Sequence, residues 1–298
     1  MKSVIPWGVN VPFVYLAFAL WGAGAVELLR YPSVHPYLMM LGAYSLYFGM
    51  IQRLFFPARK YFVTQLMSMA VGIPLHWGQV TGSAALLATE VWSLVDVKRY
   101  GSKYPVNYLV LSSVPMTLLA WTIYGGNYWL LVPPLLSYLL GVNEGVFSST
   151  LRIRPRMGIQ QLPIMASVMA SWFFPVAVVP AVLIYVASFG WKGARPRLSA
   201  LITLVVMVVV PTSSVWLGYQ VHAFTLGIMS PLFSSCVTFS LSSENYDLEW
   251  PAPLLFAASY FTRQLSLLLS GLPWITGMIF LLFLISRKLG LKSLLLDF

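Results

Sequence analysis

The sequence predicts an all-α protein, a polytopic bundle of about eleven or twelve transmembrane helices. Of its 298 residues, 59% are hydrophobic and only 9% are charged, whereas a soluble globular domain carries about 25% charged residues. Most apolar runs approach the ~20 residues that a helix needs to cross a bilayer. They lack the alternation of barrel strands, and in lipid only helices or closed barrels satisfy every backbone polar group.

Eleven apolar segments are expected to form the spans. No polar linker between them is long enough to separate two domains, so residues 1–298 are expected to form one integral-membrane domain. The expected spans are 11–29, 36–56, 62–80, 82–96, 106–124, 128–147, 160–188, 198–219, 222–242, 251–270 and 272–287.

The segment 160–188 decides the topology. Its prolines allow one kinked helix or two half-helices that turn back. If Lys2 is cytoplasmic, the basic cluster of 152–156 falls inside. Only an even number of passes over 160–188 then puts the cluster of 192–197 inside as well. A re-entrant hairpin is therefore favoured, in a multi-pass protein of the cell membrane with a cytoplasmic N-terminus.

The net charge of +10 does not indicate nucleic-acid binding. The basic residues lie in short loops beside apolar runs, where they set orientation in the membrane. Cys236 is the only cysteine, and the CxxC, CxxCH, GxGxxG and P-loop motifs are missing from the sequence. No self-contained catalytic motif is therefore expected, and lipid is the first expected partner.

A few ionisable residues lie in or near hydrocarbon, where they are costly unless paired or facing a cavity. Glu90 and Arg263 lie in mid-span, and they predict either a buried ion pair or a proton or substrate path. Glu27 is expected to pair with Arg30 one turn later or to serve the same path. Glu144 is expected to be an interfacial carboxylate that faces the basic loop of 152–156.

The chain has three histidines, His35, His76 and His222. In the favoured topology all three lie at the outer side of the bilayer. Neutral imidazole ligates haem iron well, and two histidines from facing helices can hold a b-type haem. The alternative is that they are interfacial side chains, since Pro36 places His35 just outside its helix and Trp77 marks an interface beside His76.

Prolines such as Pro74, Pro115 and Pro211 interrupt the spans. Broken helices are tolerated where a neighbour or a cavity satisfies the freed carbonyl groups. They also form the substrate sites of many transporters. Aromatic residues, 15% of the chain, suit membrane interfaces or a quinone site.

Two segments carry a resemblance to known membrane proteins. "HAFTLGIMSPL" at His222 and "HPYLMMLGAYSLYFGM" at His35 resemble helix openings of the NnrS-type and haem–copper-oxidase-like family. The resemblance implies a bundle of about a dozen helices in which His35 and His222 ligate haem or copper. Three histidines do not supply the copper-binding group of a true oxidase, so oxygen reduction is not expected.

The chain is also similar in size and hydrophobicity to the membrane subunit of the archaeal cytochrome b558/566 complex. That similarity implies an extracytoplasmic cytochrome or a Rieske-type subunit as partner. The expected function is a quinol-linked electron-transfer subunit of a respiratory complex, with haem b near the outer face. The alternatives are a proton- or ion-coupled transporter or permease and a haem-free membrane anchor of a cytochrome complex.

Overall fold

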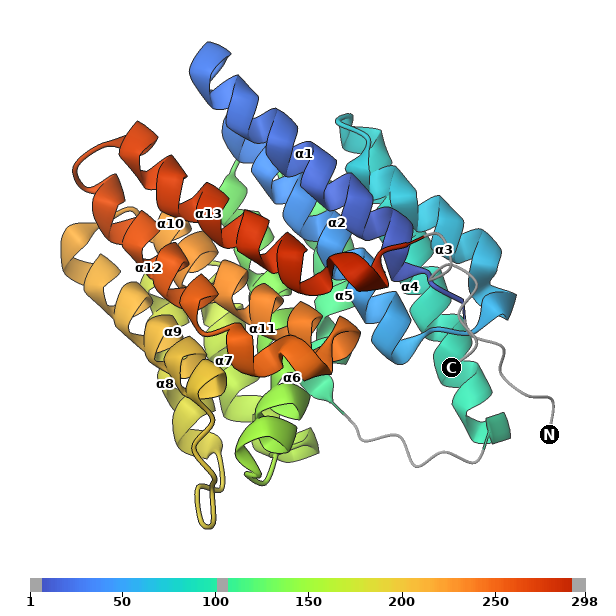
Figure 1. The fold of residues 1–298 in the computed structure, drawn as a ribbon. Coiled ribbons are helices and arrows are strands. Elements are labelled where there is room, and N and C mark those ends of the chain that lie inside the picture. The colour runs from blue at the N-terminus through green and yellow to red at the C-terminus, as the bar shows by residue number, and fades with distance from the viewer. Residues whose placement is uncertain (1–6, 101–106, 291–298) are drawn as a thin grey trace. The chain divides into compact units, whose positions relative to one another are not determined.

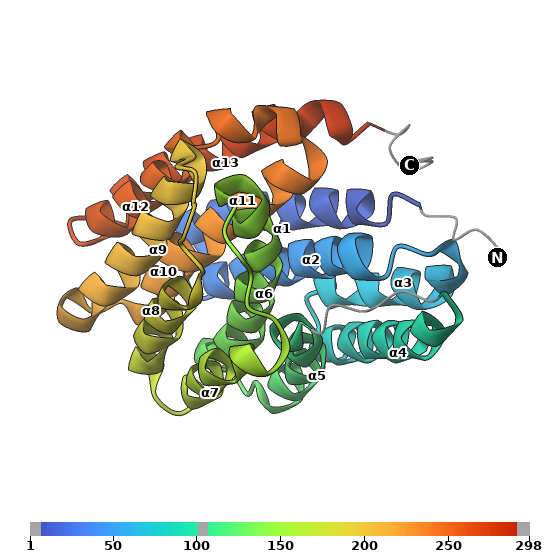
Figure 2. The same cartoon turned by 90° about the horizontal axis from the view of Figure 1, so that it is seen from below.

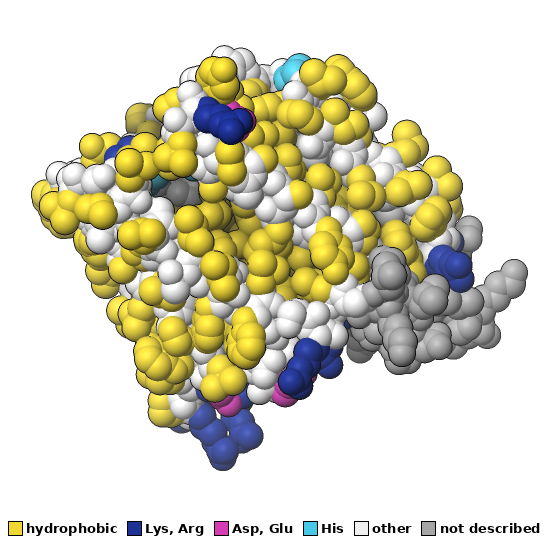
Figure 3. Space-filling view, turned by 45° about the horizontal axis from the view of Figure 1, so that its top comes forward, with side chains coloured by type: hydrophobic (Ala, Val, Ile, Leu, Met, Phe, Trp, Pro, Cys, Tyr) yellow, Lys and Arg dark blue, Asp and Glu magenta, His cyan; other side chains and the backbone are white. Residues whose placement is uncertain are grey.

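A computed structural model describes residues 7–100 and 107–290 of the chain, and within these ranges every regular element is a helix (Figure 1). The all-α prediction is confirmed. Hydrophobic side chains cover most of the face in Figure 3. Large apolar side chains such as Trp216 and Phe283 are 79% and 72% exposed, which suits a surface that contacts lipid.

Thirteen α-helices are present in the described residues. They are α1 (Asn10–Arg30), α2 (His35–Phe55), α3 (Phe62–Ser68), α4 (His76–Tyr100), α5 (Tyr108–Ile123), α6 (Val132–Leu151), α7 (Leu162–Ala170), α8 (Val178–Ser188), α9 (Leu198–Leu217), α10 (Gln220–Phe224), α11 (Ser230–Leu241), α12 (Pro251–Arg263) and α13 (Leu267–Ile285). Short 3-10 helices lie between several of them: η1 (Arg59–Tyr61), η2 (Met69–Gly72), η3 (Tyr128–Leu131), η4 (Gly158–Gln161), η5 (Pro175–Ala177), η7 (Ser243–Leu248) and η8 (Ser286–Lys288). The π-helix η6 (Thr225–Met229) joins α10 to α11.

Five helical stretches in the described ranges are long and apolar enough to cross a membrane, so the chain is a multi-pass membrane protein. Several of the other expected spans are shorter helices joined in hairpins. The five stretches are Asn10–Arg30, Tyr128–Leu151, Leu198–Leu217, Gln220–Leu241 and Leu267–Lys288.

The chain divides into two compact units. Unit 1 contains the described parts of Met1–Pro105, Ser113–Leu135 and Leu289–Phe298, and unit 2 contains those of Val106–Ser112 and Leu136–Lys288. Whether both belong to one domain stays a prediction.

Unit 1 begins with the helix pair α1 and α2, which pack closely along their lengths. Glycines on α2 allow the approach, because a Cβ atom at Gly42 would lie 2.5 Å from the Trp21 ring and one at Gly49 would lie 2.5 Å from Phe13 Cβ. At the other end of α2, the Arg53 guanidinium donates to Asn10 Oδ1 over 3.0 Å. The start of α1 therefore lies beside the end of α2.

A hairpin follows α2 and returns to its own starting point. The short helix α3 and then η2 run away from the end of α2. The helix α4 packs against both and runs back toward it (Figure 2). An ion pair between Lys60 and Asp96 closes this hairpin, and Tyr61 donates its hydroxyl to Asp96 over 3.0 Å. The expected span over 62–80 is wrong, because Pro74 lies in a break after η2 and His76 begins a new helix.

A second hairpin of the same kind lies in unit 2. The helices α7 and α8 pack against each other, although each is too short to cross a bilayer. Backbone bonds tie the two ends together, from Gly190 N–H to Arg154 O over 3.4 Å and from Arg195 N–H to Leu151 O over 2.8 Å. The hairpin expected over 160–188 is present, and both basic clusters lie at the same end of unit 2. That it re-enters the membrane stays a prediction.

A third hairpin consists of α12 and α13, which pack together along most of α12. An ion pair between Lys288 Nζ and Glu244 Oε1 over 3.3 Å joins the end of this hairpin to its start. Asn245 Nδ2 also donates to the Leu284 carbonyl over 2.9 Å.

The element order therefore repeats three times. Each copy has two helices followed by a hairpin that opens with a short helix and closes near its start; we call these the returning hairpins, over 59–96, 154–190 and 244–288. In the first and third copies the contacts from Arg53 to Asn10 and from Arg197 to Asp247 place the first helix's start near the hairpin's start. Polar side chains near these starts are the natural place to look for a site.

Candidate functional site

His35 is half-buried at the start of α2, and one hydrogen bond fixes its ring. Its Nδ1 atom donates to the Gly24 carbonyl on α1 over 2.9 Å. This tautomer leaves Nε2 with a free lone pair, as in histidines that ligate metals. His35 is the first residue of α2, so the expectation that Pro36 keeps it outside the helix is wrong, since proline is tolerated in a first turn.

His76 also begins a helix, and His222 lies in the first turn of one. His76 is exposed at the start of α4, so it does not close a span. His222 is half-buried in α10, and its ring meets the Tyr219 ring edge-on with centroids 6.3 Å apart.

The haem prediction is not tested by this geometry. His35 and His76 belong to unit 1 and His222 belongs to unit 2. Among the described residues, no group of three or more His, Cys, Asp or Glu side chains is arranged to hold a metal ion. A haem needs only two axial ligands, so the assignment to His222 and His35 stays a prediction.

The charged residues expected in mid-span have separate surroundings. Glu90 is buried on α4 of unit 1, close enough to Tyr47 to interact electrostatically, and its Oε1 has no hydrogen bond within the described chain. Arg263 ends α12 of unit 2, with its guanidinium carbon 4.9 Å from the centre of the Tyr219 ring. Their ion pair stays a prediction. Glu27 is half-buried and forms no ion pair with any described residue.

Glu144 on α6 is a buried carboxylate with good hydrogen bonds. Gln161 Nε2 donates to its Oε2 over 2.6 Å, and the backbone N–H of Arg156 donates to its Oε1. The same Gln161 side chain reaches Asn107 Oδ1 over 3.2 Å. The expectation that Glu144 faces the loop of 152–156 is confirmed, although the donor is the backbone and the carboxylate is only 1% exposed.

A second carboxylate in unit 2, Glu249, was not expected from the sequence. It follows η7 at the start of the third returning hairpin and is 0% exposed. Neither of its oxygens has a hydrogen-bond partner among the described residues. Ser234 of α11 lies beside it, but that hydroxyl also lacks the geometry of a hydrogen bond.

One sequence signal points to this site. Ser230, Ser234 and Thr238 are spaced by four residues, so they lie along one face of α11, a helix that also contains Ser235 and Ser240. All three are buried. A buried hydroxyl stripe needs a polar neighbour, and Glu249 supplies one.

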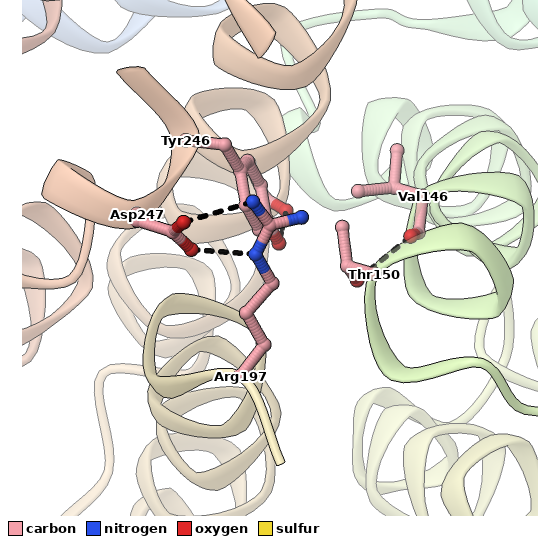
Figure 4. A network of polar contacts seen from close by, with 6 residues as sticks. Val146, Thr150, Arg197, Tyr246 and Asp247 are labelled. Atoms are coloured by element: carbon pink, nitrogen blue, oxygen red, sulfur yellow. Dashed lines mark hydrogen bonds and ion pairs between the residues drawn. The ribbon is translucent and has the colours of Figure 1, made fainter. Parts of the chain in front are cut away.

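An exposed ion pair lies on the same loop as Glu249. Arg197, at the start of α9, donates to both oxygens of Asp247 over 2.5 and 2.9 Å, as Figure 4 shows. Its guanidinium carbon lies 5.3 Å from the centre of the buried Tyr246 ring. The Tyr246 hydroxyl lies 3.1 Å from Ser235 Oγ. Thr150 of α6 also lies near this hydroxyl (Figure 4).

These surroundings give the two acids of this loop, Glu249 and Asp247, different pKa values. Burial raises the pKa of Glu249 to about 8, with only a small opposing effect of Ser234. The Arg197 guanidinium lowers the pKa of Asp247, so this exposed carboxylate stays ionised. A neutral acid in the interior thus lies near an ionised acid at the surface, an arrangement that can bind and release a proton.

Comparison of the chain with protein-family models, with curated proteins and with solved structures finds no match. The functional argument therefore depends on the chain's own geometry.

Proposed function

We propose that this chain is a membrane transporter, a proton- or ion-coupled permease. The observation that carries the proposal is the set of three returning hairpins, each of which opens with a short helix after a non-helical stretch. Discontinuous helices of this kind form the substrate and ion sites of many transporters, because their exposed backbone groups and helix ends are available for binding.

Buried carboxylates give further support. Glu90 in unit 1 and Glu249 in unit 2 are buried with at least one oxygen that has no described hydrogen-bond partner. A carboxylate in such a place is costly unless it binds a cation or a proton. Coupling a solute to an ion requires a group of this type.

The test uses the purified chain in lipid vesicles that contain a pH-sensitive dye. A potassium gradient with valinomycin supplies the driving force, and the vesicles are assayed alone and with amino acids, phosphate and organic cations as probes. A second set follows radioactive sodium. Proton or sodium uptake faster than in protein-free vesicles is expected. No uptake of either ion under all these conditions contradicts the proposal.

The respiratory reading is the second candidate, and the ring of His35 favours it. The bond from Nδ1 to Gly24 O leaves Nε2 for a ligand. In this reading the chain is a quinol-linked electron-transfer subunit with haem b on His222 and His35, or with the haem on an extracytoplasmic cytochrome or Rieske-type partner. If this chain binds no haem itself, it would be a haem-free membrane anchor of a cytochrome complex.

A reduced-minus-oxidised spectrum of the chain purified without partners tests this candidate. A b-type band that disappears in His222→Ala and His35→Ala supports it. A flat spectrum contradicts haem binding by this chain, and the anchor reading then requires that a haem protein copurifies with it.

A further inference from the structure

We propose that Glu249 is the proton-binding group of this transporter and that it exchanges its proton with water at the Arg- and Lys-rich end of unit 2. The inference rests on the proposed function and adds to it the identity of the coupling ion and of the residue that carries it.

The first argument is the isolation of the carboxylate. Glu249 is 0% exposed, and its two oxygens and the Ser234 hydroxyl beside it have no hydrogen-bond partners in the described chain. A permanently ionised carboxylate in this position would leave a buried charge without donors, which is very unfavourable. A carboxylic acid that takes up and gives back a proton fits these surroundings.

The second argument is the contrast with Glu144 in the same unit. That carboxylate is also buried, but it accepts hydrogen bonds from a side-chain amide and from a backbone N–H. Donors of this kind stabilise the ionised form. Glu144 thus has two hydrogen-bond donors, whereas the only side chain with a donor beside Glu249 is the hydroxyl of Ser234, which does not reach hydrogen-bond geometry.

The third argument is the position of Glu249 between interior and surface. Asp247, two residues earlier, has a side chain that is 63% exposed. Tyr246, which precedes Asp247 and lies close enough to Glu249 to interact electrostatically, has its buried hydroxyl 3.1 Å from Ser235 Oγ. In this proposal a proton from water at this surface reaches Glu249 past these hydroxyls, and it returns to water by the same route without any other bond being formed or broken.

The charged and titratable groups around Glu249 come from five elements. Tyr246 of η7 is the nearest, and Arg197 of α9 lies beyond its ring, held by Asp247. The remaining groups are accounted for elsewhere: Cys236 on α11 is a buried thiol near Ser240, Glu144 on α6 is bound by Gln161 and Arg156, and Lys288 after α13 pairs with Glu244. No cation is therefore paired with Glu249 among the described residues.

The first part of the test is an infrared titration of the chain in lipid vesicles, which reports protonated carboxylic acids through their C=O stretch. Wild-type protein is expected to show an acid band that is lost with a midpoint near pH 8. The band should lose intensity in Glu249→Gln, by the amount that one carboxylic acid contributes, and should be unchanged in Glu244→Gln, a matched control on the same loop whose side chain is exposed.

Ser234→Ala keeps the test decisive if Glu249→Gln does not fold. The Ser234 hydroxyl lowers the pKa of Glu249, so its removal should shift the midpoint to higher pH. A wild-type band that neither variant changes, or no acid band that titrates near this midpoint, overturns the assignment.

The second part is proton uptake by dye-loaded vesicles. In Glu249→Gln the rate should fall to that of protein-free vesicles, whereas Glu244→Gln should keep the wild-type rate. Wild-type uptake that survives in Glu249→Gln, or uptake that follows sodium and not the pH gradient, overturns the inference and leaves the transport function standing. If the wild type takes up neither ion but its infrared titration depends on Glu249, the transport function is overturned. Glu249 then still binds a proton, but not for transport.

Discussion

The second and third returning hairpins each bring a carboxylate close to a neutral polar side chain. The position that holds the carboxylate in one hairpin holds the neutral side chain in the other. Glu144 and Ser234 lie equally far before the ends of α6 and α11, and Gln161 and Glu249 lie just before α7 and α12. In the second hairpin the acid is on the long helix and faces an amide. In the third the acid is in the loop and faces a hydroxyl.

The difference in donors matters more than the difference in burial. Both acids are almost completely buried. An amide and a backbone N–H have no alternative to donating, whereas a hydroxyl donates only one hydrogen and can direct it elsewhere. The comparison teaches that two equally buried carboxylates can differ in how strongly their surroundings stabilise the ionised form.

The largest expected effect is a pH dependence of stability that comes from Glu249. Burial raises its pKa from 4.5 to about 8, so the stability contributed by the neutral acid is complete below about pH 4.5. It is then lost progressively as the pH rises to about 8. Over three pH units the loss is about 4 kcal/mol at 1.36 kcal/mol per unit.

Urea unfolding in detergent from pH 5 to pH 8 measures this dependence. The slope of stability against pH should be smaller in Glu249→Gln than in the wild type. Equal slopes in the two proteins would show that Glu249 does not change its protonation on unfolding between pH 5 and pH 8, which contradicts the expected pKa.

The next effect concerns Gln161, the amide that donates to Glu144. Gln161→Leu should lower the unfolding free energy by about 2 kcal/mol, because a buried carboxylate loses a donor. The neighbouring Gln160 is exposed, so Gln160→Leu is a matched control with little expected change. If both variants have the same stability, Glu144 does not depend on its donors and the contrast with Glu249 fails.

The smallest effect is expected at the exposed ion pair of Arg197 and Asp247. Asp247→Asn should change the unfolding free energy by less than about 1 kcal/mol, since exposed ion pairs contribute little and salt screens them. The difference from wild type should shrink further in high salt. A loss several times larger would mean that this pair stabilises the loop around Glu249.

Part of this fold was predictable from sequence because it follows from charge and composition. The turn of the second hairpin followed from where the basic residues of 152–156 and 192–197 must lie, and the backbone bond from Gly190 to Arg154 confirms it. The location of Glu144 near the basic loop followed from its place at the end of an apolar run.

The rest depends on tertiary packing. The segment 62–80 is apolar enough for a span, but α4 needs α3 and η2 as packing partners, so the helix breaks before Pro74. Glu249 precedes Trp250 and Pro251 at a helix start, where acidic residues usually face solvent and favour the helix dipole. Its burial results from the packing of the η7 loop on α11, which local sequence does not reveal.

The closing contacts of the hairpins have a consequence for the history of the chain. If the two helices of a copy each cross the bilayer and the hairpin returns to its own side, both ends of that copy lie on one side of the bilayer. Tandem duplication of such a module leaves every copy facing the same way, with no need to reverse the charge of its flanking loops. A module with an odd number of crossings would turn each new copy upside down.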